Sequence, residues 1–373
     1  MKYGTRTAKL LFGVAMAASL CMPYAKTEKI PWVWGYGGGT LYYREGTTNE
    51  NPKGTKWVAV ETPQGLVSIA AGADGTFWAV TNDKRLLYRQ SITTKNPMGT
   101  SWSYVPSEFA IFNIAVGKFD QVYAIRNIET KKSLALSYWR DGITETNPIG
   151  TRWVGIKNSD TKRAIGIFKD SVANPMSVVV SGNDVYGASA CTAEYTISLN
   201  KIRETMYKLS PDKSRWLDVI GGARMCVAID KDANVWSVDY DNHLWESLPL
   251  ETPSNVLQWQ PIDQSICYVA AGPAGEVWVL STSGKILRMT GRANKIPFNV
   301  LWEDVGPAPD SSVQLTFLAI GAIEAPPAEE KPAAPAPVVS PAVSPAATEV
   351  KKVKKDTKSA AKKTAVKKQA KKK

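Results

Sequence analysis

The chain of 373 residues has a formal net charge of +12 at pH 7, but this charge is concentrated at its ends. Residues 351–373 carry 12 Lys and one Asp, the first ten residues carry three further cations, and residues 11–350 are left at −2. The near-neutral body excludes a fold that binds nucleic acid through a basic surface. Thirteen Trp and 27 Gly, without a long helical pattern, indicate a β-rich chain.

Residues 1–25 have the pattern of a secretory signal peptide. Lys2, Arg6 and Lys9 form a positive region, residues 10–20 are apolar, and a small residue at Ala25 offers a cleavage site. The apolar stretch is too short for a transmembrane helix. The sequence therefore predicts a secreted or periplasmic protein, peripheral at the outer membrane or cell surface at most, and leaves lipidation at Cys21 open.

The cysteine count argues against a complete disulfide framework. Cys191, Cys226 and Cys267 remain after cleavage, and an odd number cannot all pair within one chain. Cys226 and Cys267 lie in apolar segments and are expected to be buried thiols.

A 14-residue motif occurs three times without gaps. The copies are REGTTNENPKGTKW at residues 44–57, RQSITTKNPMGTSW at 89–102 and RDGITETNPIGTRW at 140–153. In Asn-Pro-x-Gly, Asn supports the start of a type I turn, Pro presets φ at the second position and Gly suits the fourth. Each copy therefore predicts a strand end, a tight turn and a new strand that begins at Trp.

A second motif, a strand of small residues followed by a turn and an aromatic strand, alternates with the first. It is clearest in SIAAGADGTFWAV at residues 68–80 and YVAAGPAGEVWVL at 268–280. Its aromatic position recurs at intervals of 42 to 63 residues and marks six units, at Trp34, Trp78, Tyr123, Tyr186, Trp236 and Trp278. Four short strands per unit predict an all-β, six-bladed β-propeller.

The ends of the repeat region indicate how the ring closes. The first unit lacks a small-residue strand before Trp34, and the last is followed by an extra one at residues 317–321. Together these strands complete one blade from the N- and C-terminal ends, which removes exposed sheet edges. The predicted organisation is a signal peptide at 1–25, a propeller at 26–323, a linker at 324–350 and a tail at 351–373.

The pairing of x-YR-x-G-[IT]-T-x-x-NPxGTxW with IAxGxDGxxWxV resembles the tectonin β-propeller repeat, shared by horseshoe-crab and fish-egg lectins and by slime-mould and fungal tectonins. The match is specific in the first three units and weakens afterwards, because the last two lack NPxGT. The resemblance implies a non-catalytic binding protein, often a lectin for surface glycans or lipopolysaccharide, and does not supply the sugar.

The composition changes abruptly at residue 324. Residues 324–350 are rich in Pro and Ala and predict a semi-extended linker. Residues 351–373 cannot bury a core and are expected to be disordered. On a secreted protein, the run from Lys351 to Lys373 is expected to bind polyanions such as lipopolysaccharide phosphates, with a solubilising tail as the alternative.

The sequence contains few groups for catalysis. His243 is the only histidine, and the chain has no zinc-protease helix, nucleophile elbow or P-loop motif. No enzymatic activity, cofactor or metal is predicted. Asp239 and Asp241 offer carboxylates for a cation, with a solvated turn as the simpler interpretation, so calcium dependence is left open.

A binding module fits better, because aromatic faces and planar hydrogen-bonding groups bind sugars. A structural role is the alternative throughout: Trp57, Trp102 and Trp153 packing between blades, and the three Asn residues holding turns. A propeller that docks a protein partner, with its tail on nucleic acid or cell wall, is the alternative function. The candidate ligand contacts are Tyr43, Arg44, Glu45 and Asn51 in the first unit, Tyr88, Arg89 and Asn96 in the second, and Trp139, Arg140, Asp141 and Asn147 in the third.

Overall fold

The structure is a computed structural model of the whole chain. It describes residues 28–63, 65–118, 120–126, 136–156, 177–181, 184–191, 203–219, 226–239, 241–247, 259–293, 299–308 and 313–325. These residues form 24 strands and contain no α-helix. In the described part of the chain, no helix is long and apolar enough to cross a membrane.

The strands form six antiparallel sheets of four strands each. Blade 1 joins the last strand of the chain to the first three: β24 (Leu315–Glu324), β1 (Lys29–Gly37), β2 (Thr40–Glu45) and β3 (Lys56–Val60). Blade 2 contains β4 (Leu66–Ala71), β5 (Phe77–Thr81), β6 (Leu86–Arg89) and β7 (Trp102–Val105). Blade 3 contains β8 (Ile111–Val116), β9 (Val122–Arg126), β10 (Leu136–Asp141) and β11 (Arg152–Gly155).

The other three sheets follow the same order. Blade 4 contains β12 (Ser177–Ser181), β13 (Asp184–Cys191), β14 (Arg203–Leu209) and β15 (Trp216–Val219). Blade 5 contains β16 (Cys226–Ile229), β17 (Val235–Val238), β18 (His243–Ser247) and β19 (Trp259–Gln264). Blade 6 contains β20 (Ile266–Ala271), β21 (Val277–Ser281), β22 (Ile286–Arg292) and β23 (Val300–Asp304).

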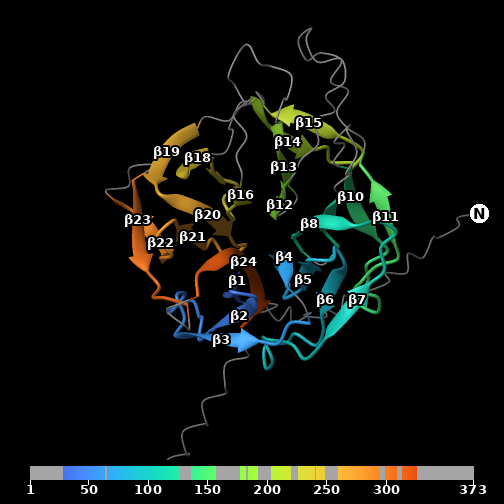
Figure 1. Cartoon of the computed structure of the whole chain (residues 1–373), viewed down its shortest axis with the longest axis horizontal. Coiled ribbons are helices and arrows are strands. Elements are labelled where there is room, and N and C mark those ends of the chain that lie inside the picture. Colours follow the sequence, from blue (N-terminus) through green and yellow to red (C-terminus); the bar gives the residue numbers. More distant parts are fainter. Residues whose placement is uncertain are drawn as a thin grey trace, which may run out of the picture. The chain divides into compact units, whose positions relative to one another are not determined.

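The inner strands of the six sheets contact one another in a closed ring, in the order β24, β4, β8, β12, β16, β20 and back to β24 (Figure 1). The prediction of an all-β propeller is confirmed. Each of the six aromatic positions of the repeat lies in the second strand of one sheet. The terminal strands close blade 1 as predicted, because β1 pairs with β24 from Lys29↔Glu324 to Gly37↔Leu315.

Small residues in the inner strands are required by the close approach of neighbouring blades. A Cβ on Gly321 would lie 2.3 Å from the carbonyl oxygen of Gly72, and one on Gly72 would lie 3.0 Å from that of Gly117. Backbone hydrogen bonds join the same segments, since the Ala322 N–H donates to Gly72 and the Ala73 N–H donates to Gly117. A larger side chain would separate these strands and break the bonds.

The hydrophobic core lies between the blades as well as within them. Trp57 packs against blade 6, Trp102 against blade 1 and Trp153 against blade 2. The prediction that these three Trp residues pack between blades is confirmed. Burying aromatic side chains of this size dominates the stability of such interfaces.

Candidate functional site

The Asn-Pro-x-Gly turn has one conformation in blades 1, 2 and 3. In blade 2 the N–H of Gly99 donates to the carbonyl of Asn96 at 3.1 Å, which closes the turn across Pro97. The Asn96 side chain donates from Nδ2 to the Ser91 carbonyl at 3.3 Å. The same two bonds recur around Asn51 and Asn147. These Asn residues therefore hold turns, as the alternative interpretation of the sequence predicted.

A buried arginine donates a hydrogen bond to a backbone carbonyl of each of these turns. Arg89 is 6% exposed, donates from Nε to the Met98 carbonyl at 2.8 Å, and lies with its guanidinium carbon 5.1 Å from the Trp102 ring centroid. Arg44 and Arg140 make the equivalent bond and stack on the equivalent Trp. Burial lowers the pKa of each arginine from its ordinary value.

The remaining candidates also have partners within the fold. Tyr43 is 5% exposed, and burial raises its pKa to about 12. Glu45 forms an exposed ion pair with Lys56 at 3.0 Å, and Asp141 forms one with Arg152 at 2.9 Å. Tyr88 packs on Trp78, and the Lys213 ammonium lies over the ring of Trp139. The structure thus distributes these residues over three blades in similar local settings, and ligand contact by them stays a prediction.

The last three blades replace this arrangement. The position of Tyr43, Tyr88 and Trp139, which pairs with the aromatic second strand, holds Lys208, Glu246 and Arg288. The next position, which is arginine in blades 1–3, holds Leu209, Ser247 and Met289. Ion pairs stabilise two of the charged positions: Glu246 with Arg292 of blade 6, and Arg288 with Glu276 and Glu303.

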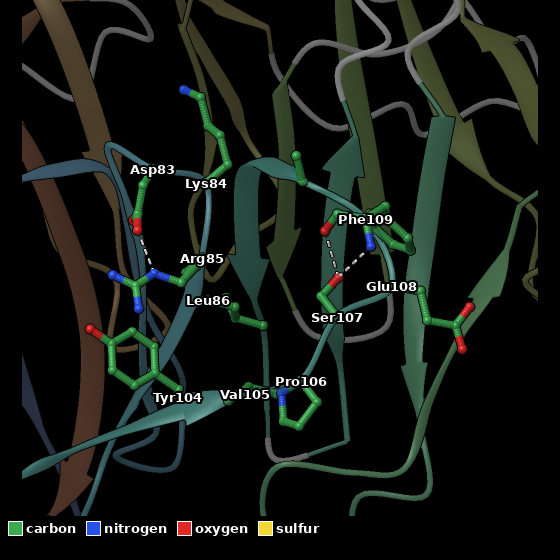
Figure 2. Close-up of a pocket in the computed structure, with 11 residues that line it drawn as sticks. Asp83, Lys84, Arg85, Leu86, Tyr104, Val105, Pro106, Ser107, Glu108 and Phe109 are labelled. Atoms are coloured by element: carbon green, nitrogen blue, oxygen red, sulfur yellow. Dashed lines mark hydrogen bonds and ion pairs between the residues drawn. The ribbon is translucent and has the colours of Figure 1, made fainter.

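A pocket with a volume of about 540 Å³ lies between the β5–β6 turn of blade 2 and the connection from blade 2 to blade 3. The β5–β6 turn forms one side, and the connection from β7 to β8 forms the other (Figure 2). Figure 2 shows Asp83, Arg85 and Tyr104 on the first side, and Ser107, Glu108 and Phe109 on the second. The lining residues are Asp83, Lys84, Arg85, Leu86, Tyr104, Val105, Pro106, Ser107, Glu108, Phe109 and Ala110.

Tyr104 is the most exposed large aromatic side chain among the described residues, at 48%. The Arg85 guanidinium lies 4.4 Å from the centroid of its ring and forms an ion pair with Asp83. Hydrogen bonds from Thr81 and Arg85 hold the pKa of Asp83 below its ordinary value. An aromatic face beside a fixed planar cation is an arrangement that binds polyhydroxylated rings.

The β5–β6 turn carries backbone strain at the pocket. Lys84 has φ of 67°, a conformation that glycine adopts at the matching positions Gly39 and Gly284. A non-glycine residue in the left-handed region costs roughly 1–2 kcal/mol. Strained residues cluster at ligand sites, and the Lys84 ammonium lies over the ring of Phe112 at 5.1 Å.

The sequence analysis missed Tyr104, Arg85 and Phe109. Tyr104 follows Trp102 by two positions, where the other two copies of the motif have Ala59 and Gly155. The signal that could have identified it was a departure from the repeat, because an aromatic residue stands where the other copies have a small one.

The other sequence candidates have structural explanations. Asp239 accepts hydrogen bonds from the backbone N–H groups of Asp241 and His243 and from the indole of Trp245. Burial raises the pKa of Asp239, but these bonds outweigh burial and hold the pKa below its ordinary value. Asp239, Asp241 and His243 lie close enough together to hold a cation, but the hydrogen bonds that the Asp239 carboxylate accepts already account for the turn.

The thiols of Cys226 and Cys267 are partly buried and unpaired. Burial raises the pKa of the Cys226 thiol to about 12 and raises that of Cys267. The predicted signal peptide with Cys21, the predicted linker beyond residue 325, the Lys-rich tail, and residues 157–176 and 192–202 of the fourth unit lie outside the described residues.

A closed ring of four-stranded antiparallel sheets defines a β-propeller. Residues 31–174, which span β1 to β11, match the family model of the Tectonin domain. The resemblance to the tectonin β-propeller repeat seen in the sequence is confirmed over this region. The matched region contains all three Asn-Pro-x-Gly turns.

Several solved structures are similar to this chain. YCF48 from Cyanidioschyzon merolae is 14% identical, with 67% of this chain and 75% of that chain covered and a TM-score of 0.41. Human WBSCR16 is 13% identical over 74% and 78%, with a TM-score of 0.38. Prp20p from Saccharomyces cerevisiae is 11% identical over 72% and 68%, with a TM-score of 0.39. A comparison with curated proteins found no match.

Proposed function

We propose that this protein is a non-catalytic carbohydrate-binding protein, a lectin, that recognises envelope or surface glycans such as lipopolysaccharide. The observation that carries the proposal is the pocket in which the half-exposed ring of Tyr104 lies beside the Arg85 guanidinium. Sugars bind to proteins by placing an apolar ring face on an aromatic side chain while fixed polar groups bond their hydroxyls.

The Lys-rich tail adds a second contribution in this proposal. With +11 in 23 residues, it would hold the protein at an anionic surface, each Lys contributing about 1 kcal/mol near the surface. Weak pocket binding and weak tail binding on one polyvalent surface would reinforce each other through effective concentration. A location in the periplasm or outside the cell, after signal cleavage, belongs to the same proposal.

The test uses the full chain on a glycan array and on lipopolysaccharide, at 0.05 and 0.5 M NaCl. The expected result is binding that survives high salt, is competed by free saccharide and falls at least tenfold in Tyr104→Ala. Leu301→Ala is the matched control, because Leu301 is also about half exposed, at 47%, but lies on β23 far from the pocket in the sheet order. Binding that vanished entirely in high salt would contradict the proposal.

A protein-docking propeller is the second candidate function. The floor of the same pocket is apolar, with Leu86 and Val105 buried and Pro106 exposed, which also suits an extended peptide. In that case no saccharide would compete, and the Tyr104→Ala variant would lose a protein partner in cross-linking experiments while its glycan-array signal equalled that of the wild type.

A further inference from the structure

We infer that the pocket of Tyr104 and Arg85 selects uncharged saccharide rings and discriminates against their carboxylate- or phosphate-bearing counterparts. This inference rests on the proposed function and adds the ligand class. Under this inference the pocket binds neutral sugar, and the cationic tail provides the attraction to polyanions.

The charged groups at the pocket are paired within the fold. The Asp83 carboxylate accepts hydrogen bonds from the Thr81 hydroxyl and the Arg85 Nε, so the charge of Arg85 is compensated at contact distance. The Lys84 ammonium is over the Phe112 ring. With Glu108 included, the lining contains two acidic and two basic residues, so the pocket has no net charge to attract an anion.

The orientation of the charged side chains agrees with this balance. In Figure 2, Lys84 and Glu108 extend away from the other lining side chains, while Leu86, Val105 and Pro106 lie between the two sides. A bound carboxylate or phosphate would lose its hydration against this apolar floor. It would gain only a guanidinium whose charge Asp83 already compensates.

A neutral sugar ring matches the other groups of the pocket, because its hydroxyls can accept hydrogen bonds and its C–H face can pack on Tyr104. Arg85 uses Nε for Asp83, so the N–H groups of its two terminal nitrogens are the donors that sugar hydroxyls would accept from. The Arg85 guanidinium covers one face of the Tyr104 ring, and the residue as a whole is still 48% exposed, which leaves aromatic surface for the C–H face of a sugar. Ser107 is already occupied, because its hydroxyl donates to the Phe109 carbonyl at 2.8 Å.

The experiment measures binding of the full chain to matched pairs of glycosides that differ only in the charge at C6. The pairs are methyl glucoside with methyl glucuronide, methyl galactoside with methyl galacturonide, and glucose with glucose 6-phosphate. A neutral and acidic glycan array extends them, and saturation-transfer NMR at 0.05 and 0.5 M NaCl gives the affinities. The variants are Tyr104→Ala and the control Leu301→Ala.

The expected result is that the neutral member of at least one pair binds at least fivefold more tightly than its charged partner. Its affinity should change less than twofold with salt and with Leu301→Ala, and fall at least tenfold with Tyr104→Ala. A charged member that bound more tightly than its neutral partner at a Tyr104-dependent site would overturn the inference and leave the proposed function standing. Saccharide binding unchanged in Tyr104→Ala would do the same. Absence of binding to every glycan would overturn both.

Discussion

Arginines at the base of the Asn-Pro-x-Gly turns show why residues recur in this sequence. Arg44, Arg89 and Arg140 each donate to a carbonyl of the turn and stack on the Trp that begins the next strand. A planar guanidinium can donate to these carbonyls in a fixed geometry and stack on an indole face at the same time. The three arginines recur because the same turn and the same Trp are packed together in three blades.

Replacing Arg89 by methionine tests this structural role. Methionine stands at the matching position of blade 6, Met289, but in blade 2 it would leave the Met98 carbonyl without its donor and Trp102 without its cation. We expect the free energy of unfolding in urea to fall by about 1–3 kcal/mol. Arg85→Met is the control, because Arg85 is exposed, and we expect a change within about 0.5 kcal/mol. Equal losses in the two variants would contradict the argument.

Gly99, the last residue of the same turn, is required for two separable reasons. Its φ is 65°, and a Cβ there would lie 2.5 Å from the Gln90 carbonyl oxygen, which the Thr100 N–H holds in place. Gly39 has a φ of 82° with nothing within 4 Å of its Cβ position. We expect Gly39→Ala to cost about 1–2 kcal/mol for the conformation alone, and Gly99→Ala to cost clearly more. Urea unfolding measures both, and equal costs would show that the clash relaxes.

The burial of Glu246 beside Arg292 makes the free energy of unfolding depend on pH in a direction that can be stated. Burial raises the pKa of Glu246, and Arg292 offsets only part of this. Because the folded pKa exceeds the unfolded value, the contribution of Glu246 favours folding below pH 4.5 and is lost as the pH rises through the folded pKa. We therefore expect Glu246→Gln to gain stability relative to the wild type between pH 4 and pH 8.

Urea unfolding at several pH values measures this difference. Glu303→Gln is the control of opposite sign, because the Lys53 hydrogen bond lowers the pKa of Glu303. That contribution is present above the unfolded pKa and is lost as the pH falls. If Glu246→Gln instead lost relative stability with rising pH, the attraction of Arg292 would outweigh burial.

At the scale of strands and turns, the sequence predicts what repeats. The Asn-Pro-x-Gly turns, the small inner strands and the closure by the terminal strands all follow from local chemistry that several blades share. The pocket could not be predicted in this way, because Tyr104 occurs once, where the other copies have Ala59 and Gly155. Tyr104 forms a pocket only together with the β5–β6 turn and the connection from β7 to β8, and these segments meet only in the three-dimensional structure.

The strand β24 is expected to be indispensable, although it lies next to the linker in the sequence. It is the inner strand of blade 1 and pairs with β1 at nine positions, and its side chains pack against blade 6 and blade 2. Removing residues 315–373 should abolish cooperative thermal unfolding. Removing residues 327–373 keeps the compact unit that ends at Pro326 and should leave the melting temperature within about 2 °C. A cooperative transition in the shorter protein would contradict the role of β24 in closing the ring.

At the scale of the whole molecule, the repeated motif and the net positive charge occupy different parts of the chain. Blades 1–3 carry the tectonin turn and the arginine that supports it, whereas blades 4–6 hold charged residues at the matching strand positions. Net charge follows another division, since residues 11–350 sum to −2 and residues 351–373 to +11. The proposed attraction to polyanions and the proposed recognition by the pocket should therefore be separable by substitution.

Replacing all 12 lysines of residues 351–373 by glutamine tests this independence in a full-length chain. The tail then loses its cations, while every strand and the pocket keep their sequence. Attraction to a polyanion depends on the number of ions released, so elution from heparin should move to much lower salt. The melting temperature should not change, because the described propeller residues are untouched, and Tyr104→Ala should leave heparin elution where it is in the wild type. If the glutamine variant still eluted from heparin at high salt, a cationic surface on the propeller would be responsible. The near-neutral net charge of residues 11–350 would then hide a local site for polyanions.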